Sequence, residues 1–114
     1  MSNYHEIDPV GLKAKIDAGE PMRLIDVRNQ DEFDQGQIKT GEFITLSEIP
    51  AKLDEFDKDT PVIFYCRSGV RSAEACKFLE ANTGIVATNL VGGILAWAQL
   101  YDVINPSSGE VINL

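Results

Sequence analysis

One segment of the sequence, residues 61–72, joins a short apolar run to a turn that contains a cysteine, a glycine and two arginines. Its first part, Val62–Tyr65, is continuously apolar, which is typical of a central parallel strand covered on both faces. The turn that follows, residues 66–71, is called the cysteine loop below, and a helical pattern of apolar residues starts at its end. A strand that passes through a tight loop into a helix is a unit of a parallel α/β sheet.

The apolar patterns of the remaining chain alternate between strand and helix. We expect strands near residues 4–7, 22–27, 42–46, 62–65 and 86–91, and helices near residues 8–19, 31–35, 47–56, 71–82 and 94–100. Asp8 and Pro9 form a favourable helix start, and Ser47 is the expected N-cap of a later helix. This order predicts an α/β fold with helices on both faces of the sheet.

The length and charge of the chain limit its organisation and its partners. A chain of 114 residues is long enough for one domain with a hydrophobic core and too short for two. A formal net charge of -8 argues against nucleic acid or an anionic membrane as partner. No stretch approaches the ~18 apolar residues of a membrane span, and the first residues do not resemble a secretory signal. We therefore expect a cytoplasmic protein.

The chain has two cysteines and one histidine, and this restricts the available chemistry. Two cysteines without a CxxC pair indicate neither a disulfide framework nor a zinc site, so we expect no metal and no cofactor. His5 lies near the N-terminus and is not expected to activate Cys66. A helix N-terminus, a loop that Gly69 allows to curl, and the charges of Arg67 and Arg71 would stabilise a thiolate instead.

Each cysteine has a structural and a chemical interpretation. A cysteine at a strand end is often buried and inert. The glycine three residues after Cys66 and the arginine five residues after it favour a reactive thiolate. Cys76 belongs to the apolar pattern of the following helix, and we interpret it as a core residue. To act as a resolving partner it would have to leave that face.

Three separate blocks of the sequence resemble the rhodanese-like sulfurtransferases, especially the single-domain type. The cysteine loop resembles the active-site loop of that family. Leu24–Arg28, together with Glu32 and Phe33, is similar to its first block, and Leu90–Trp97 is similar to its closing motif. The resemblance implies a rhodanese fold, with a five-stranded, mostly parallel sheet and helices on both faces.

The resemblance extends from about residue 6 to residue 97. We therefore place the rhodanese domain at residues 1–100 and treat residues 101–114 as a C-terminal tail of unknown role. The tail is open to three interpretations: a frayed end, an extra edge strand, or a segment that reaches a second subunit. Gln37 replaces the usual histidine of the family, and residues 39–43 replace a Pro-Gly-Ala-rich segment, so contacts made there are not predicted.

The resemblance also implies a reaction. Cys66 would attack the sulfane sulfur of thiosulfate or of a persulfide donor, and the resulting Cys66 persulfide would pass its outer sulfur to cyanide, a thiol or a protein cysteine. The loop amides would hold the sulfur anion, and Arg67 and Arg71 would orient an anionic donor. The expected substrate-binding residues are Arg67, Ser68, Gly69, Val70 and Arg71. The expected supporting residues, which do not react, are Asp26, Arg28 and Ser72.

Two other functions remain open. Related folds act as phosphatases or arsenate reductases with a longer loop, whereas only four residues separate Cys66 from Arg71. A tetrahedral oxyanion needs the larger ring, and Tyr65 stands where the phosphatase motif has histidine. The second alternative is a non-enzymatic persulfide carrier or a protein-docking module. The intact loop favours chemistry, but it does not separate a carrier from an enzyme.

Overall fold

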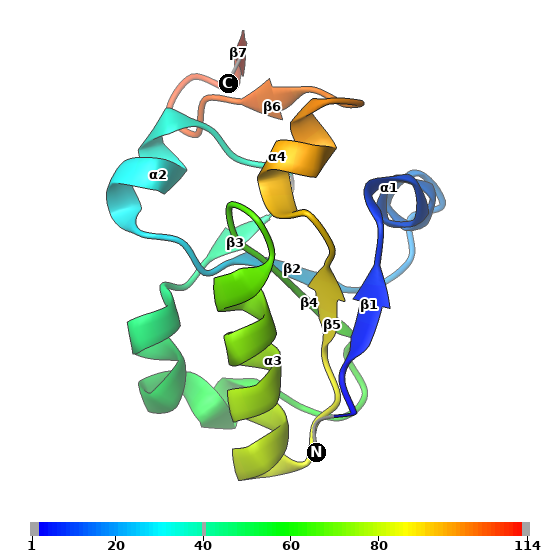
Figure 1. The fold of residues 1–114 in the computed structure, drawn as a ribbon, viewed down its shortest axis with the longest axis vertical. Helices are drawn as coiled ribbons and strands as arrows, with labels where there is room; N and C mark the ends of the chain where they lie inside the picture. The colour runs from blue at the N-terminus through cyan, green and yellow to red at the C-terminus, as the bar shows by residue number, and fades with distance from the viewer. Residues whose placement is uncertain (1–2, 40, 113–114) are drawn as a thin grey trace.

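The structure is a computed structural model that describes residues 3–39 and 41–112. Its main sheet has five strands in the order β1-β5-β4-β2-β3, and each pairing in it is parallel (Figure 1). The strands are β1 (His5–Ile7), β2 (Arg23–Asp26), β3 (Glu42–Phe43), β4 (Val62–Tyr65) and β5 (Thr88–Leu90). The predicted parallel α/β sheet is confirmed, with β4 at its centre.

Helices cover both faces of this sheet (Figure 1). The helix α3 (Val70–Thr83) and the 3₁₀ helix η1 (Leu46–Glu55) pack on one face, and α1 (Pro9–Asp17) and α4 (Gly93–Ala98) pack on the other. The short helix α2 (Gln30–Gln35) follows the end of β2. None of the helices in the described part of the chain is long and apolar enough to cross a bilayer.

The side chains of β4 enter two separate hydrophobic cores. Val62 and Phe64 belong to the core shared with α3 and η1, whereas Ile63 and Tyr65 belong to the core shared with α1 and α4. Successive side chains of a strand point to opposite faces, so both sets are buried when helices cover both faces. This explains why the run is apolar without interruption.

Two helix starts show which capping predictions hold. Asp8 caps α1 as predicted, since its Oδ1 accepts a hydrogen bond of 2.7 Å from the Gly11 amide. The prediction that Ser47 caps the next helix is wrong, because η1 begins after Thr45. The amide and the hydroxyl of Thr45 both donate to the Glu48 carboxylate, at 3.3 and 3.0 Å. This Thr-x-x-Glu pair satisfies an N–H group that the helix leaves unpaired.

The tail forms an antiparallel hairpin of β6 (Val103–Ile104) and β7 (Val111–Ile112), which is separate from the main sheet. The hairpin lies beyond the carboxyl ends of the strands, near α2 and α4 (Figure 1). Two backbone hydrogen bonds of 2.8 and 3.0 Å join Gln37 to Ile104. Residues 101–112 therefore pack as a hairpin of their own. Residues 113–114 of the tail, and Thr40 of the 39–43 segment, lie outside the described residues.

Candidate active site

The cysteine loop lies at the carboxyl end of β4, where open α/β sheets bind their ligands. The chain turns back at Gly69, whose φ of 105° is in the left-handed region that favours glycine, and α3 starts at the next residue. The first-turn amides of α3 therefore face the loop. The side chains of Ser68 and Val70 are exposed, so these two residues offer the loop interior only their backbone.

The other side of the loop is held by the N-terminus of α4. The Ile94 amide donates to the Cys66 carbonyl at 2.9 Å, and the Leu95 amide donates to the Arg67 carbonyl at 3.2 Å. A Cβ atom on Gly93 would lie 2.4 Å from the Arg67 carbonyl oxygen. The glycine is therefore required, because only a residue without a side chain allows this approach.

Three donors surround the Cys66 sulfur. The Gly69 amide lies 3.1 Å from Sγ, and the amide and hydroxyl of Ser72 each lie 3.4 Å from it. Cys66 is only 1% exposed, and its burial alone would raise the pKa of the thiol. The Ser72 hydroxyl and amide, with the amides of Gly69 and Ser68, outweigh burial and hold the pKa of Cys66 below its usual value. The site therefore favours a thiolate.

Ser72 and Asn89 form a buried polar pair behind the sulfur. Ser72 was expected to support the loop, and the structure places its hydroxyl against the sulfur itself. The same hydroxyl donates to Asn89 Oδ1, while Asn89 Nδ2 donates to the Gly69 carbonyl at 3.1 Å. One hydroxyl proton thus has two acceptors in reach. Sequence reasoning missed Asn89, although a polar side chain inside an apolar strand signals a buried hydrogen bond.

The structure separates two arginines that the sequence treats alike. Arg71 donates to both oxygens of Glu32, at 2.6 and 2.8 Å, and this pair joins α3 to α2. The hydrogen bond from Arg71 lowers the pKa of the Glu32 carboxyl to about 2. Arg67 is exposed and forms no ion pair within residues 3–39 and 41–112. Arg67 is therefore the cation of the loop that remains available to a ligand.

Asp26 and Arg28 form a buried ion pair at the end of β2. The Asp26 carboxylate accepts hydrogen bonds from the backbone amide of Arg28 at 2.9 Å and from its guanidinium at 2.8 Å. The same guanidinium donates to the Gly36 carbonyl at 2.6 Å. These contacts join β2 to the end of α2. That the pair supports the strand ends around the loop, and does not react, stays a prediction.

Cys76 lies within α3, one turn after Ser72, in the core that α3 and η1 share with the sheet. It is fully buried among apolar residues of α3 and neighbouring elements. Burial raises the pKa of the Cys76 thiol to about 12. Its interpretation as a core residue agrees with this position.

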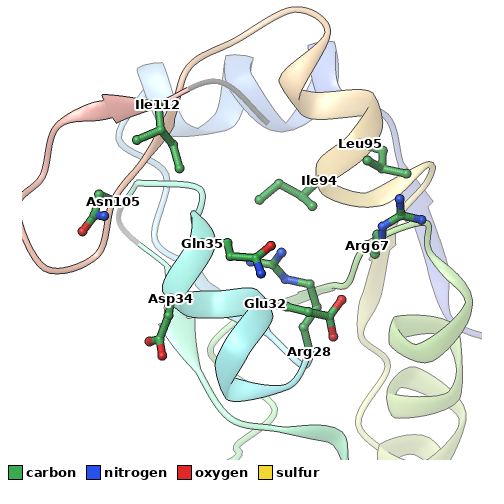
Figure 2. A pocket seen from close by; sticks show the side chains of 9 residues that line it. All are labelled: Arg28, Glu32, Asp34, Gln35, Arg67, Ile94, Leu95, Asn105 and Ile112. Carbon is green, nitrogen blue, oxygen red and sulfur yellow. The ribbon is translucent and has the colours of Figure 1, made fainter.

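A cavity of about 540 Å³ lies beside the cysteine loop (Figure 2). Its walls come from the loop, α2, α4 and the hairpin, and they include Arg67, Glu32, Gln35, Ile94, Leu95 and Ile112. In Figure 2, Gln35 and Ile94 extend toward the space between α2 and α4, and Ile112 extends toward it from the hairpin. No cluster of three or more His, Cys, Asp or Glu side chains within the described residues is arranged to hold a metal ion.

Known proteins that resemble this chain share its family. The profile of the family described as rhodanese-like domain matches residues 8–100. YtwF of Bacillus subtilis, provisionally named a sulfurtransferase, is 42% identical over 92 residues, which cover 81% of this chain and 88% of YtwF. A protein of Allochromatium vinosum named sulfurtransferase is 38% identical over 95 residues, which cover 83% of this chain and 89% of that protein.

A solved structure adds the same fold. The crystal structure of a rhodanese-like domain protein from Staphylococcus aureus matches with a TM-score of 0.76 and 38% sequence identity. The match covers 82% of this chain and 90% of that protein. The relatives' names support a sulfurtransferase of the rhodanese type in general.

Proposed function

Because the chain belongs to the rhodanese-like family, we propose that it transfers sulfane sulfur through a persulfide formed on Cys66. The observation that carries this proposal is the set of donors around the Cys66 sulfur, namely the Gly69 amide and the amide and hydroxyl of Ser72. These groups stabilise a thiolate before the reaction. The same loop amides stabilise the terminal sulfur of a persulfide anion after it.

The first half-reaction is an attack by the Cys66 thiolate on the sulfane sulfur of the donor. A new S–S bond forms as the donor's bond to that sulfur breaks, and the bonding electrons leave with sulfite or with an organic thiolate. Cys66 then carries the outer sulfur as Cys66–S–S⁻. Arg67 attracts an anionic donor to the loop, because its charge is unpaired within the described residues.

The second half-reaction returns the enzyme to its starting state. A nucleophilic acceptor, such as cyanide, a small thiol or a protein cysteine, attacks the outer sulfur, and the S–S bond electrons return to Cys66. The two half-reactions balance in atoms and electrons. The loop amides keep the leaving Cys66 thiolate stabilised, so the step needs no histidine.

The decisive experiment is the intact mass of the protein after incubation with thiosulfate, mercaptopyruvate or glutathione persulfide in turn. We expect a gain of one sulfur atom with at least one donor, mapped to the peptide that contains Cys66, and its loss when cyanide is added. If none of the three donors adds sulfur to the protein, the proposal is contradicted. Stable loading without turnover by cyanide or thiols would instead indicate a persulfide carrier.

The same preparation tests the phosphatase alternative. The short ring between Cys66 and Arg71 should accept one sulfur atom rather than a tetrahedral oxyanion. We therefore expect negligible hydrolysis of a phosphate ester under conditions in which the protein loads with sulfur. Rapid hydrolysis that depends on Cys66 would favour the phosphatase.

A further inference from the structure

We propose that the C-terminal hairpin is part of the substrate site, and that the cavity it borders binds the organic group of a small, carboxylate-bearing thiol persulfide. The inference rests on the proposed function and specifies its donor. It concerns a segment beyond residue 100, where the match to the family profile ends. The juxtaposition that carries it is the hairpin residue Ile112 and the loop residue Arg67 on the lining of one cavity.

The cavity borders the cysteine loop. Arg67, which follows Cys66 in the chain, lies on its lining. Ile94 and Leu95 lie on it as well, and their amides hold the carbonyls of Cys66 and Arg67. A molecule in this cavity therefore touches the residues that fix the position of the reactive cysteine. The Cys66 side chain is not on the lining, so only the sulfur end of the donor would enter the loop.

The hairpin wall is attached to the domain by several contacts. Two backbone hydrogen bonds join Ile104 to Gln37, the position at which the family usually has histidine. Val103 is buried, and the Trp97 indole donates to the Asp102 carbonyl at 3.1 Å. These contacts hold β6, and β7 pairs with it so that Ile112 lies opposite Val103. The hairpin that forms this wall is therefore packed against the domain as part of the fold.

The lining carries two arginines and two carboxylates, and one of the arginines has no ion-pair partner among the described residues. Arg28 is already paired with Asp26, and Glu32 with Arg71, so the guanidinium of Arg67 is the cation left to bind a carboxylate. The second carboxylate, that of Asp34, accepts a hydrogen bond from Gln30 and points away from Arg67 in Figure 2. The Gln35 amide suits hydrogen bonds to a peptide-like group, and the apolar side chains Ile94 and Ile112 suit methylene groups. A volume of about 540 Å³ is in the range of small-molecule sites. Thiosulfate fills only a small part of it.

The transfer step is the one already described, with an organic leaving group. The Cys66 thiolate attacks the terminal sulfur of R–S–SH, a new S–S bond forms, and the old S–S bond breaks. Its electrons leave with R–S⁻, which takes up the proton of the terminal sulfur to become R–SH, so that Cys66 is left as Cys66–S–S⁻. The R group remains between the hairpin and α4 during the step.

The test compares Ile112→Trp with Val111→Trp, its neighbour on the same strand. Ile112 lines the cavity, whereas Val111 is 59% exposed and is not on that lining. Each variant is assayed for kcat/KM with glutathione persulfide and with thiosulfate, with cyanide as the common acceptor. We expect Ile112→Trp to lower the value for glutathione persulfide by about tenfold, because the indole takes up part of the cavity, and to leave that for thiosulfate within about twofold. Val111→Trp should change neither.

The kcat/KM of each variant with thiosulfate reports whether that variant is folded and loads with sulfur. An equal effect on both donors in Ile112→Trp, or no effect on either, would overturn the inference while leaving the proposed function intact. If Ile112→Trp does not fold, Ile112→Ala replaces it and should raise the KM for glutathione persulfide a few-fold at unchanged kcat, because apolar contact is lost. An unchanged KM would overturn the inference. Loss of loading by every donor in the unmodified protein would instead refute the proposed function.

Discussion

Cys66 and Cys76 are both buried thiols, one just before α3 and the other within it, yet their pKa values shift in opposite directions. Cys66 is 1% exposed and Cys76 is fully buried. Burial disfavours the charged form of both, and it raises the pKa of Cys76 to about 12. The pKa of Cys66 is lowered instead, because hydrogen-bond donors at Ser72 and in the loop outweigh burial. The difference shows that directed donors, rather than exposure, produce the acidic thiol.

The position of each cysteine relative to α3 explains why only one has such donors. The amides inside a helix donate hydrogen bonds to carbonyls of the preceding turn. The amides around Cys76 are therefore not available to its sulfur. Cys66 precedes the helix and faces amides of the first turn, which have no partner within the helix. The Gly69 and Ser72 amides serve this purpose. One helix therefore provides an inert environment along its body and an activating one at its start.

Exchange of each cysteine for serine gives the largest predicted difference between the two sites. Cys66→Ser should lower the rate of sulfur transfer by roughly 1,000-fold or more, since a nucleophile is removed. Cys76→Ser should leave the rate within about twofold of the unmodified protein, although the buried hydroxyl should lower the stability by about 1 kcal/mol. The measurements are thiocyanate formation from the best donor and the thermal midpoint of unfolding.

A retained rate in Cys66→Ser would assign the chemistry to another residue. A large loss in Cys76→Ser, with an unchanged thermal midpoint, would show that the core thiol takes part in transfer. Either result would remove the contrast between the two sites.

Removal of the Ser72 hydroxyl tests whether directed donors cause the contrast. In the thiolate form, the hydroxyl proton should turn from Asn89 to the Cys66 sulfur, because a charged acceptor forms the stronger bond. Ser72→Ala should therefore raise the pKa of Cys66. Loading below neutral pH should become slower by roughly tenfold, since a hydrogen bond to a charged group contributes about 1.5–3 kcal/mol. The measurement is the rate of alkylation by iodoacetamide as a function of pH.

Ser68→Ala is the matched control, because the Ser68 side chain is exposed and only its amide faces the sulfur. Its alkylation profile should equal that of the unmodified protein. If both variants show the same profile as the unmodified protein, the hydroxyl is not a donor to the thiolate. The amides alone would then account for the acidity of Cys66.

The parts of the fold that depend on neighbouring residues in the chain were predictable. The continuous apolar run of β4, the Asp8 cap and the helix after the cysteine loop follow from local patterns. The cap of η1 lies two residues before the predicted Ser47, because Thr45 makes a reciprocal contact with Glu48. Boundaries of this kind depend on one or two hydrogen bonds rather than on periodicity.

The parts of the site that depend on distant pairings were not predictable. The Arg71 contact with Glu32 joins residues 39 positions apart, and Asn89 comes to Ser72 from another strand. A sequence shows that Arg71 is charged, but it does not show that the guanidinium is already paired with a carboxylate. The hairpin wall of the cavity was hidden for the same reason, since it forms only where Ile104 meets Gln37.

The smallest predicted effect concerns whether the charge of Arg71 adds to the contrast between the thiols. Glu32→Gln removes the carboxylate that compensates Arg71, so the pKa of Cys66 should fall further, whereas that of Cys76 should not change. The shift should be small, because the guanidinium is partly exposed to solvent that screens its charge. Alkylation profiles of the two cysteines measure both effects. An unchanged Cys66 profile would show that the Arg71 charge does not reach the sulfur.

The same variant should change stability in a pH-dependent way. Arg71 lowers the pKa of Glu32 in the folded protein from 4.5 to about 2, so the pair stabilises the fold fully above the higher value. Because the pair is partly exposed, Glu32→Gln should cost only about 1 kcal/mol in urea unfolding at neutral pH. The difference should shrink as pH falls from about 4.5 to 2, where Glu32 becomes protonated in both states.

Glu74→Gln, on the exposed Glu74–Lys77 pair of α3, is the control and should cost less at every pH. A pH-independent cost in Glu32→Gln would show that packing between α2 and α3, rather than charge, is what Glu32 contributes.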